Sequence, residues 1–81
     1  MKKSVQVSYF AVLREQRGLG QESVSTGAST AAELYEELRA RHGFTLPADR
    51  LRVAINDEFE PWGAAVGDGD SVVFIPPVSG G

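Results

Sequence analysis

One amphipathic helical pattern lies among several short alternating runs, and it restricts the possible folds more than any other feature of the chain. The pattern predicts a helix over residues 31–42. Thr30 and Glu33 form the Thr-x-x-Glu pair typical of a capped N-terminus, and Gly43 follows as an end signal. The apolar positions share one face of this helix: Ala31, Leu34 and Leu38. Such a helix needs a second layer against which to bury that face.

Runs that alternate between apolar and polar residues predict that the second layer is a β-sheet. The predicted strands cover residues 4–10, 22–25, 51–56 and 71–75, with a short segment that begins at Phe59 and a short helix over 11–17. The order predicts an α+β domain in which a mixed sheet packs on one main helix. We expect one domain over residues 1–75 and a flexible C-terminal tail over residues 76–81.

Size, cysteine content and charge limit the function. A chain of 81 residues has little room for an enclosed active site, which favours a carrier, adaptor or subunit over an enzyme that acts alone. The chain contains no cysteine and no apolar run near the ~20 residues that span a bilayer, so we predict a cytoplasmic protein without membrane contact. Residues 53–81 carry five acidic side chains and no Lys or Arg, which argues against nucleic-acid binding there. These carboxylates are either solvated or form a docking surface for a basic partner.

The familiar ligand-binding motifs are incomplete. Gly18-Leu19-Gly20 lacks the third glycine of a dinucleotide-binding loop, because position 23 is serine. Asp68 and Asp70 are explained by turn chemistry, and no metal site is predicted. His42 is the only histidine, and we expect it to interact favourably with the C-terminal end of the helix dipole. Trp62 is expected to pack against the core.

The alternation leaves an apolar set on the sheet face opposite the helix. Phe10, Ala54, Val73 and Ile75 fall on that face, and Phe59 could lie nearby. Contiguous exposed apolar surface marks a partner site. Two alternatives remain at this stage: the face assignment slips in the last strand, or the loop around Trp62 covers the patch.

The C-terminus carries the chemistry that the rest of the chain lacks. The sequence ends Pro76-Pro77-Val78-Ser79-Gly80-Gly81 directly after the last predicted strand. The Gly81 carboxylate is an anion at neutral pH and can attack the α-phosphate of ATP to give an acyl-adenylate. Gly80 and Gly81 have no Cβ and fit a narrow channel, whereas Pro76 and Pro77 stiffen the base. Six extended residues reach at most about 20 Å, enough to enter another protein's active site.

These segments together resemble the ubiquitin-like β-grasp sulfur carriers, and specifically the MoaD family of molybdopterin synthase small subunits. The resemblance covers nearly the whole chain. It rests on residues 9–15 (Tyr-Phe-Ala-Val-Leu-Arg-Glu), 53–56 (Val-Ala-Ile-Asn), 68–70 (Asp-Gly-Asp) and 72–81, which end in Pro-Pro-Val-Ser-Gly-Gly. Many members of the family have threonine where Ser79 stands.

The resemblance implies a subunit that donates sulfur rather than an enzyme in its own right. An E1-like activating enzyme would use ATP to adenylate Gly81, and a sulfur donor protein would convert the adenylate to a thiocarboxylate. The loaded tail would enter the large synthase subunit and give its sulfur to a cyclic pterin precursor of the molybdenum cofactor. The family assembly is a heterotetramer whose interface uses the apolar sheet patch, with Phe10, Phe59 and Ile75, and the tail, with partner-binding residues Pro76, Pro77, Val78 and Ser79. No cofactor is expected on this chain itself.

Two further functions share the same activated tail. One is sulfur delivery to a thiamine, tRNA or cysteine pathway. The other belongs to a different class, a ubiquitin-like modifier joined to lysines through Gly81.

Overall fold

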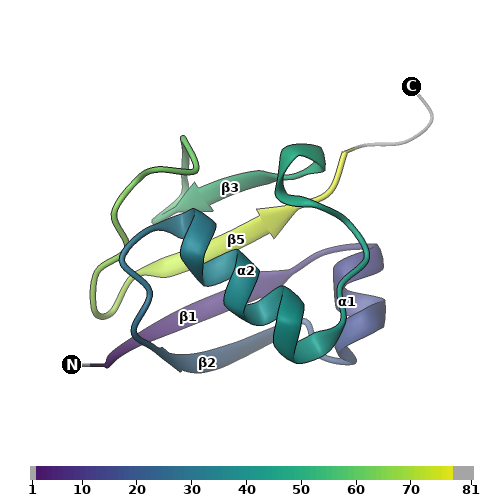
Figure 1. Ribbon diagram of the computed structural model, residues 1–81, viewed down its shortest axis with the longest axis horizontal. Helices are drawn as coiled ribbons and strands as arrows, with labels where there is room; N and C mark the ends of the chain where they lie inside the picture. The colour runs from purple at the N-terminus through teal and green to yellow at the C-terminus, as the bar shows by residue number, and fades with distance from the viewer. Residues whose placement is uncertain (1, 78–81) are drawn as a thin grey trace.

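The predicted α+β architecture is confirmed by a computed structural model, which describes residues 2–77. The elements follow in the order β1 (Lys3–Tyr9), α1 (Val12–Arg17), β2 (Gln21–Thr26), α2 (Ala31–His42), the 3-10 turn η1 (Ala48–Arg50), β3 (Arg52–Ile55), β4 (Glu58–Glu60) and β5 (Ser71–Ile75). The strands form one sheet in the order β2-β1-β5-β3-β4 (Figure 1). β1 and β5 run parallel at the centre, and the other pairs are antiparallel. The sheet is therefore mixed.

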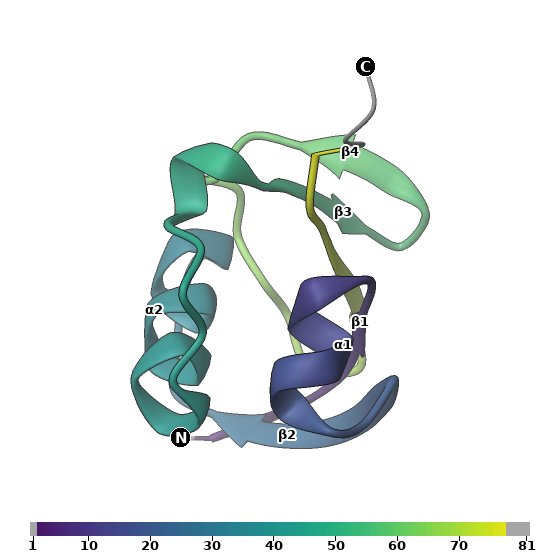
Figure 2. The same ribbon diagram turned by 90° about the vertical axis from the view of Figure 1, so that its right-hand side faces the viewer.

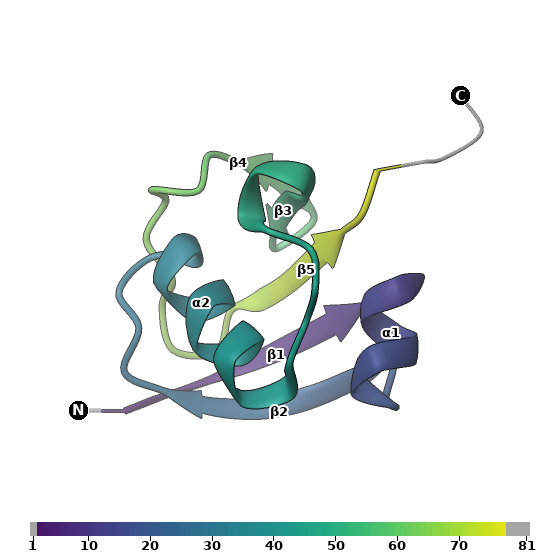
Figure 3. The same cartoon turned by 45° about the vertical axis from the view of Figure 1, so that its right-hand side comes forward.

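Helix α2 covers one face of this sheet (Figure 3). Thr30 Oγ1 accepts a hydrogen bond from the Glu33 N–H at 3.2 Å, as the capping pair predicts. The Glu33 carboxylate reaches back to the Ser29 N–H at 2.7 Å, one residue before the position that a capping box uses. Gly43 ends the helix in the left-handed conformation, with φ of 74°.

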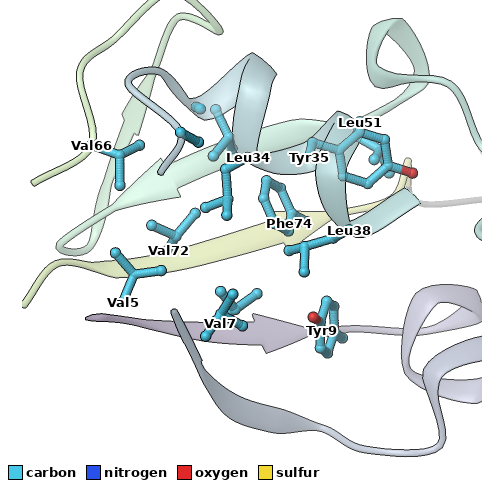
Figure 4. Close-up of a cluster of buried hydrophobic side chains, with 14 of the residues drawn as sticks. Val5, Val7, Tyr9, Leu34, Tyr35, Leu38, Leu51, Val66, Val72 and Phe74 are labelled. Atoms are coloured by element: carbon cyan, nitrogen blue, oxygen red, sulfur yellow. The ribbon is translucent and has the colours of Figure 1, made fainter. Parts of the chain in front are cut away.

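The core lies between α2 and the sheet (Figure 4). Both strands at the centre contribute, with Val5, Val7 and Tyr9 from β1 and Val72 and Phe74 from β5. Trp62 packs against this core as predicted, because its ring stacks on Phe74 with centroids 5.9 Å apart and planes 7° apart. No helix within residues 2–77 has the length and apolar character needed to cross a membrane.

A two-residue turn fixes how β4 lies against β3. Asn56 and Asp57 both have positive φ, 53° and 73°, which is the conformation of a type I′ hairpin turn. The Asn56 side chain also binds the start of β5, donating to Asp70 Oδ1 at 3.1 Å and accepting from the Ser71 N–H at 3.0 Å. Ile55 therefore pairs with Glu58 and Ala54 with Phe59, which sets the face that Phe59 occupies.

The segment between β1 and β2 differs slightly from expectation. The short helix was expected over residues 11–17, but it begins at Val12 because Ala11 has a φ of 54° and lies outside the helix. Gly18 ends it in the left-handed conformation, as predicted. Strand β1 ends at Tyr9, so Phe10 lies just past the strand rather than within it.

Candidate functional site

The base of the C-terminal tail lies at the end of the central strand β5. β5 continues directly into Pro76 and Pro77, and the chain leaves the sheet at the end of the molecule opposite the N-terminus (Figure 1). Val78, Ser79, Gly80 and Gly81 lie outside the described residues, so the roles assigned to them stay predictions, as does the flexibility of residues 76–81. A strand held between two neighbours gives the tail a fixed starting point.

A groove of about 510 Å³ opens beside this base. Five partner-binding positions were predicted within the described residues, and the groove contains four of them: Phe59, Ile75, Pro76 and Pro77. The fifth, Phe10, does not line it. Its lining consists of Asp49, Arg50, Leu51, Arg52, Phe59, Ile75, Pro76 and Pro77. We call it the tail-base groove. Figure 2 shows η1, β3, β4 and the end of β5 gathered on the same side of the molecule.

The outward sheet face is apolar near the tail, and both alternative explanations are wrong. Val72 and Phe74 are buried whereas Val73 and Ile75 are half-buried, so the last strand does not slip. Trp62 packs on the core side, where it contacts Tyr35 and Phe74, and so does not cover the outer face.

Two aromatic side chains dominate the exposed apolar area. Phe59 is 62% exposed and Phe10 is 50% exposed. Ala54 is only 8% exposed, because it is a small residue in the middle strand of the trio β5-β3-β4. It contributes much less surface than the sequence pattern suggested. Phe10 follows Tyr9, which pairs with Phe74, so it lies beside the end of β5.

Arg52 is a member of this surface that the sequence interpretation missed. It pairs with Ile75 across β3 and β5, and its guanidinium carbon lies 5.1 Å from the centre of the Phe59 ring. The strand alternation carried the signal, since Arg52 and Ala54 point to the same face. Arg50, at the end of η1, was missed as well.

A polar cluster, separate from the tail-base groove, lies at the junction of both helices with β1 and β2. Tyr9 Oη donates to Glu22 Oε2 at 2.6 Å, and Arg17 binds the same carboxylate through Nε at 2.9 Å and Nη2 at 2.8 Å. The Arg17 hydrogen bonds lower the pKa of Glu22 to about 2, whereas burial raises the pKa of Tyr9. The cluster is remote in sequence from the tail, and its contacts join four elements. We interpret it as structural.

His42 lies against this cluster in the last turn of α2. Its Nε2 is buried and has no hydrogen-bond partner among residues 2–77, and it lies 3.6 Å from Glu22 Oε2. Burial lowers the pKa of His42, and the nearby Arg17 lowers it further. The expected interaction with the helix dipole is compatible with this position, but the burial and the Glu22 contact were not predicted.

The cluster predicts acid sensitivity. The pKa of Glu22 is lower in the folded protein than its usual 4.5, so its stabilisation is complete above that pH and is lost as pH falls towards 2. Glu22→Gln is expected to cost about 1–3 kcal/mol at neutral pH, because charged hydrogen bonds are lost. The variant should also lose less stability than the wild type between pH 4.5 and about 2, as measured by urea unfolding. Glu15→Gln, at an exposed position of α1, is the matched control. Equal acid sensitivity of Glu22→Gln and the wild type would contradict this interpretation.

Comparisons with known sequences identify the family. The ThiS family matches residues 7–81. The molybdopterin synthase sulfur carrier subunit of Haemophilus influenzae is 35% identical over 78 residues, covering 93% of this chain and 96% of the relative. The subunit of the same name from Escherichia coli is 31% identical, covering 95% of this chain and 99% of the relative.

Solved structures agree with these relatives. A putative molybdopterin converting factor subunit 1 from Pyrococcus furiosus has a TM-score of 0.78 at 29% identity, covering 94% of this chain and 99% of that one. SAMP1 from Haloferax volcanii has a TM-score of 0.77 at 29% identity, covering 96% of this chain and 99% of that one. A chain of the Helicobacter pylori complex of molybdopterin-converting factor subunits 1 and 2 has a TM-score of 0.64 at 26% identity, covering 96% and 99%. The chain therefore belongs to the ThiS family, as a ubiquitin-like β-grasp protein of the group that contains the molybdopterin synthase sulfur carrier subunits.

Proposed function

We propose that this protein is the sulfur carrier subunit of a molybdopterin synthase and that the Gly81 carboxylate carries the sulfur. The observation that supports this best is the junction at Ile75-Pro76. A central strand of the sheet passes without a loop into a short segment that ends Gly80-Gly81. Full-length similarity to relatives that bear this name supports the same assignment.

The proposed chemistry begins on another protein. A Gly81 carboxylate oxygen attacks the α-phosphorus of ATP held by an E1-like activating enzyme, and pyrophosphate leaves. A hydrosulfide-level sulfur nucleophile released by a donor protein then attacks the acyl carbon, the bond to AMP breaks, and a thiocarboxylate remains on Gly81. Because thiolate-type sulfur is a strong nucleophile, the loaded tail can attack a carbon of the cyclic pterin precursor and displace an oxygen. Water then hydrolyses the acyl C–S bond, which leaves the sulfur on the pterin and restores the Gly81 carboxylate. Two deliveries are needed for the two sulfurs of the product.

The large synthase subunit is the proposed recipient of the tail. The related chain from Helicobacter pylori was solved in complex with subunit 2 of its converting factor. In our chain, the surface that would meet such a partner contains Phe10, Phe59 and Ile75 next to the tail base. We expect the partner to supply the pterin pocket and the acid–base groups, in a heterotetramer of two small and two large subunits.

Reconstitution tests this proposal. The thiocarboxylated chain is mixed with the large subunit of the same organism and the cyclic pterin precursor, and molybdopterin is quantified. We expect product at one molecule for every two loaded carriers, and none with the unloaded chain. Loaded carrier that keeps its sulfur in the presence of the large subunit and the precursor would contradict the proposal.

Phe10→Asp is expected to weaken binding of the large subunit at least about tenfold, because a charge is placed within the proposed apolar contact. Isothermal titration calorimetry measures the effect. Leu19→Asp is the matched control, since Leu19 is also a large exposed side chain, 44% exposed, but lies in the loop between α1 and β2. Equal affinities for both variants and the wild type would show that the outward face is not the docking surface.

A protein modifier remains the alternative from a different class. The similarity to SAMP1 of Haloferax volcanii, a small archaeal modifier protein, favours it. Carrier and modifier share the Gly81 adenylate but differ in the group that attacks it, a sulfur donor or a lysine amine. Sulfur delivery to a thiamine, tRNA or cysteine pathway would use the same thiocarboxylate with a different recipient.

A further inference from the structure

Two arginines border the tail-base groove and form no ion pair with an acidic residue in the part of the chain that the structure describes. Arg50 and Arg52 are the last basic residues of the chain. Neither takes part in an ion pair among residues 2–77, although Asp49 also lines the groove. By contrast, Arg17 and Arg41 each bind a carboxylate at 2.8 Å or less. The charge beside the tail base is therefore available to a binding partner.

The position of Arg52 is set by its neighbours. It pairs with Ile75 on one side, and its guanidinium lies over the Phe59 ring at 5.1 Å on the other. A guanidinium that stacks on an aromatic ring keeps its N–H edge free for a carboxylate. The positive charge thus lies within the apolar surface rather than at its margin.

We propose that the partner which receives the tail presents an acidic, partly apolar segment to the tail-base groove. Its Asp or Glu carboxylate binds Arg52, with Arg50 adding to the attraction, and its apolar side chain packs on Phe59 and Ile75. The inference rests on the proposed function, and it assigns the segment to the large synthase subunit. Continuity supports this occupant, because Pro76 and Pro77 line the groove and also begin the tail. A protein that binds the tail as far as Pro76 and Pro77 therefore also contacts the groove.

Charge reversal tests the inference. The dissociation constant of the large subunit is measured by calorimetry for the wild type, Arg52→Glu and Arg50→Glu, each at low and high NaCl. Lys2→Glu is the control, since it makes the same charge change in an exposed position just before β1. Strand β1 begins at the end of the molecule opposite to the one at which β5 ends (Figure 1). Arg52→Lys keeps the charge but loses the planar guanidinium. Thermal unfolding verifies that each variant is folded.

We expect Arg52→Glu to weaken binding by about tenfold to a hundredfold and to reduce its salt dependence. Arg50→Glu should have a smaller effect, Arg52→Lys an intermediate one, and Lys2→Glu an effect within about twofold. If Arg52→Glu binds the large subunit with the same dissociation constant and the same salt dependence as the wild type, the inference is overturned and the proposed function stays intact. Binding of Arg52→Glu to the activating enzyme is measured in the same way. If this variant loses affinity for the activating enzyme but not for the large subunit, the assignment of the partner is overturned. A wild-type chain that does not bind the large subunit at all removes the proposed function, and the inference with it.

Discussion

Deletion of Gly81 is expected to abolish sulfur transfer and to leave the free energy of unfolding within about 0.5 kcal/mol of the wild type. Transfer is expected to be lost because the new terminal carboxylate, on Gly80, falls one residue short of the proposed activation site. The fold is kept because the core elements end at Ile75. Product formation in the reconstituted synthase measures the first effect, and urea unfolding measures the second.

Ser79→Ala is the matched control for this deletion, because it changes the tail but keeps both glycines and the terminal carboxylate. We expect it to retain activity. A truncated chain that remains fully active would show that Gly81 does not carry the sulfur.

Phe74→Ala is expected to lower the free energy of unfolding by about 3–5 kcal/mol. The Phe74 side chain is fully buried, and its ring lies 5.1 Å from that of Tyr35 and 5.9 Å from that of Trp62. Domains of this length are stabilised by roughly 4–12 kcal/mol, so the variant loses a large share of its total stability. Because β5 holds the tail base, loss of this packing should also lower carrier activity near physiological temperature.

Val73→Ala is the control for Phe74→Ala. It lies next in the same strand but on the outer face, half-buried, and should cost less than about 1.5 kcal/mol. The difference is measured by denaturant unfolding of both variants. Similar losses for the two positions would contradict the assignment of the sheet faces.

Local signals made the main elements predictable from the sequence. Helix α2 has the predicted bounds because Thr30 and Gly43 mark its ends with side-chain and backbone chemistry that needs no distant residue. Strand β5 also has the predicted bounds, since Pro76 cannot donate to the sheet. The parallel pairing of β1 with β5 joins the two ends of the chain, and alternation alone does not encode such a contact.

The apolar part of the candidate site followed from alternation, whereas its charged part did not. The period of two placed Ile75 on the outer face and put Phe59 nearby, and the groove confirms that the two residues lie together. Arg52 was not singled out from the sequence, because its contact with Phe59 depends on the β3–β4 register. That register comes from the positive φ values of Asn56 and Asp57. The cluster around Glu22 was missed for a similar reason, since it brings together side chains from four elements.

The proposed function requires that Gly81 becomes a thiocarboxylate. The most direct measurement is the intact mass of the full chain after incubation with the activating enzyme, ATP and a sulfur donor. We predict a gain equal to the difference between one sulfur and one oxygen atom, and no gain without ATP or in the chain that lacks Gly81. An unchanged mass, or conjugates of the chain with other proteins and no thiocarboxylate, would show that Gly81 does not carry sulfur.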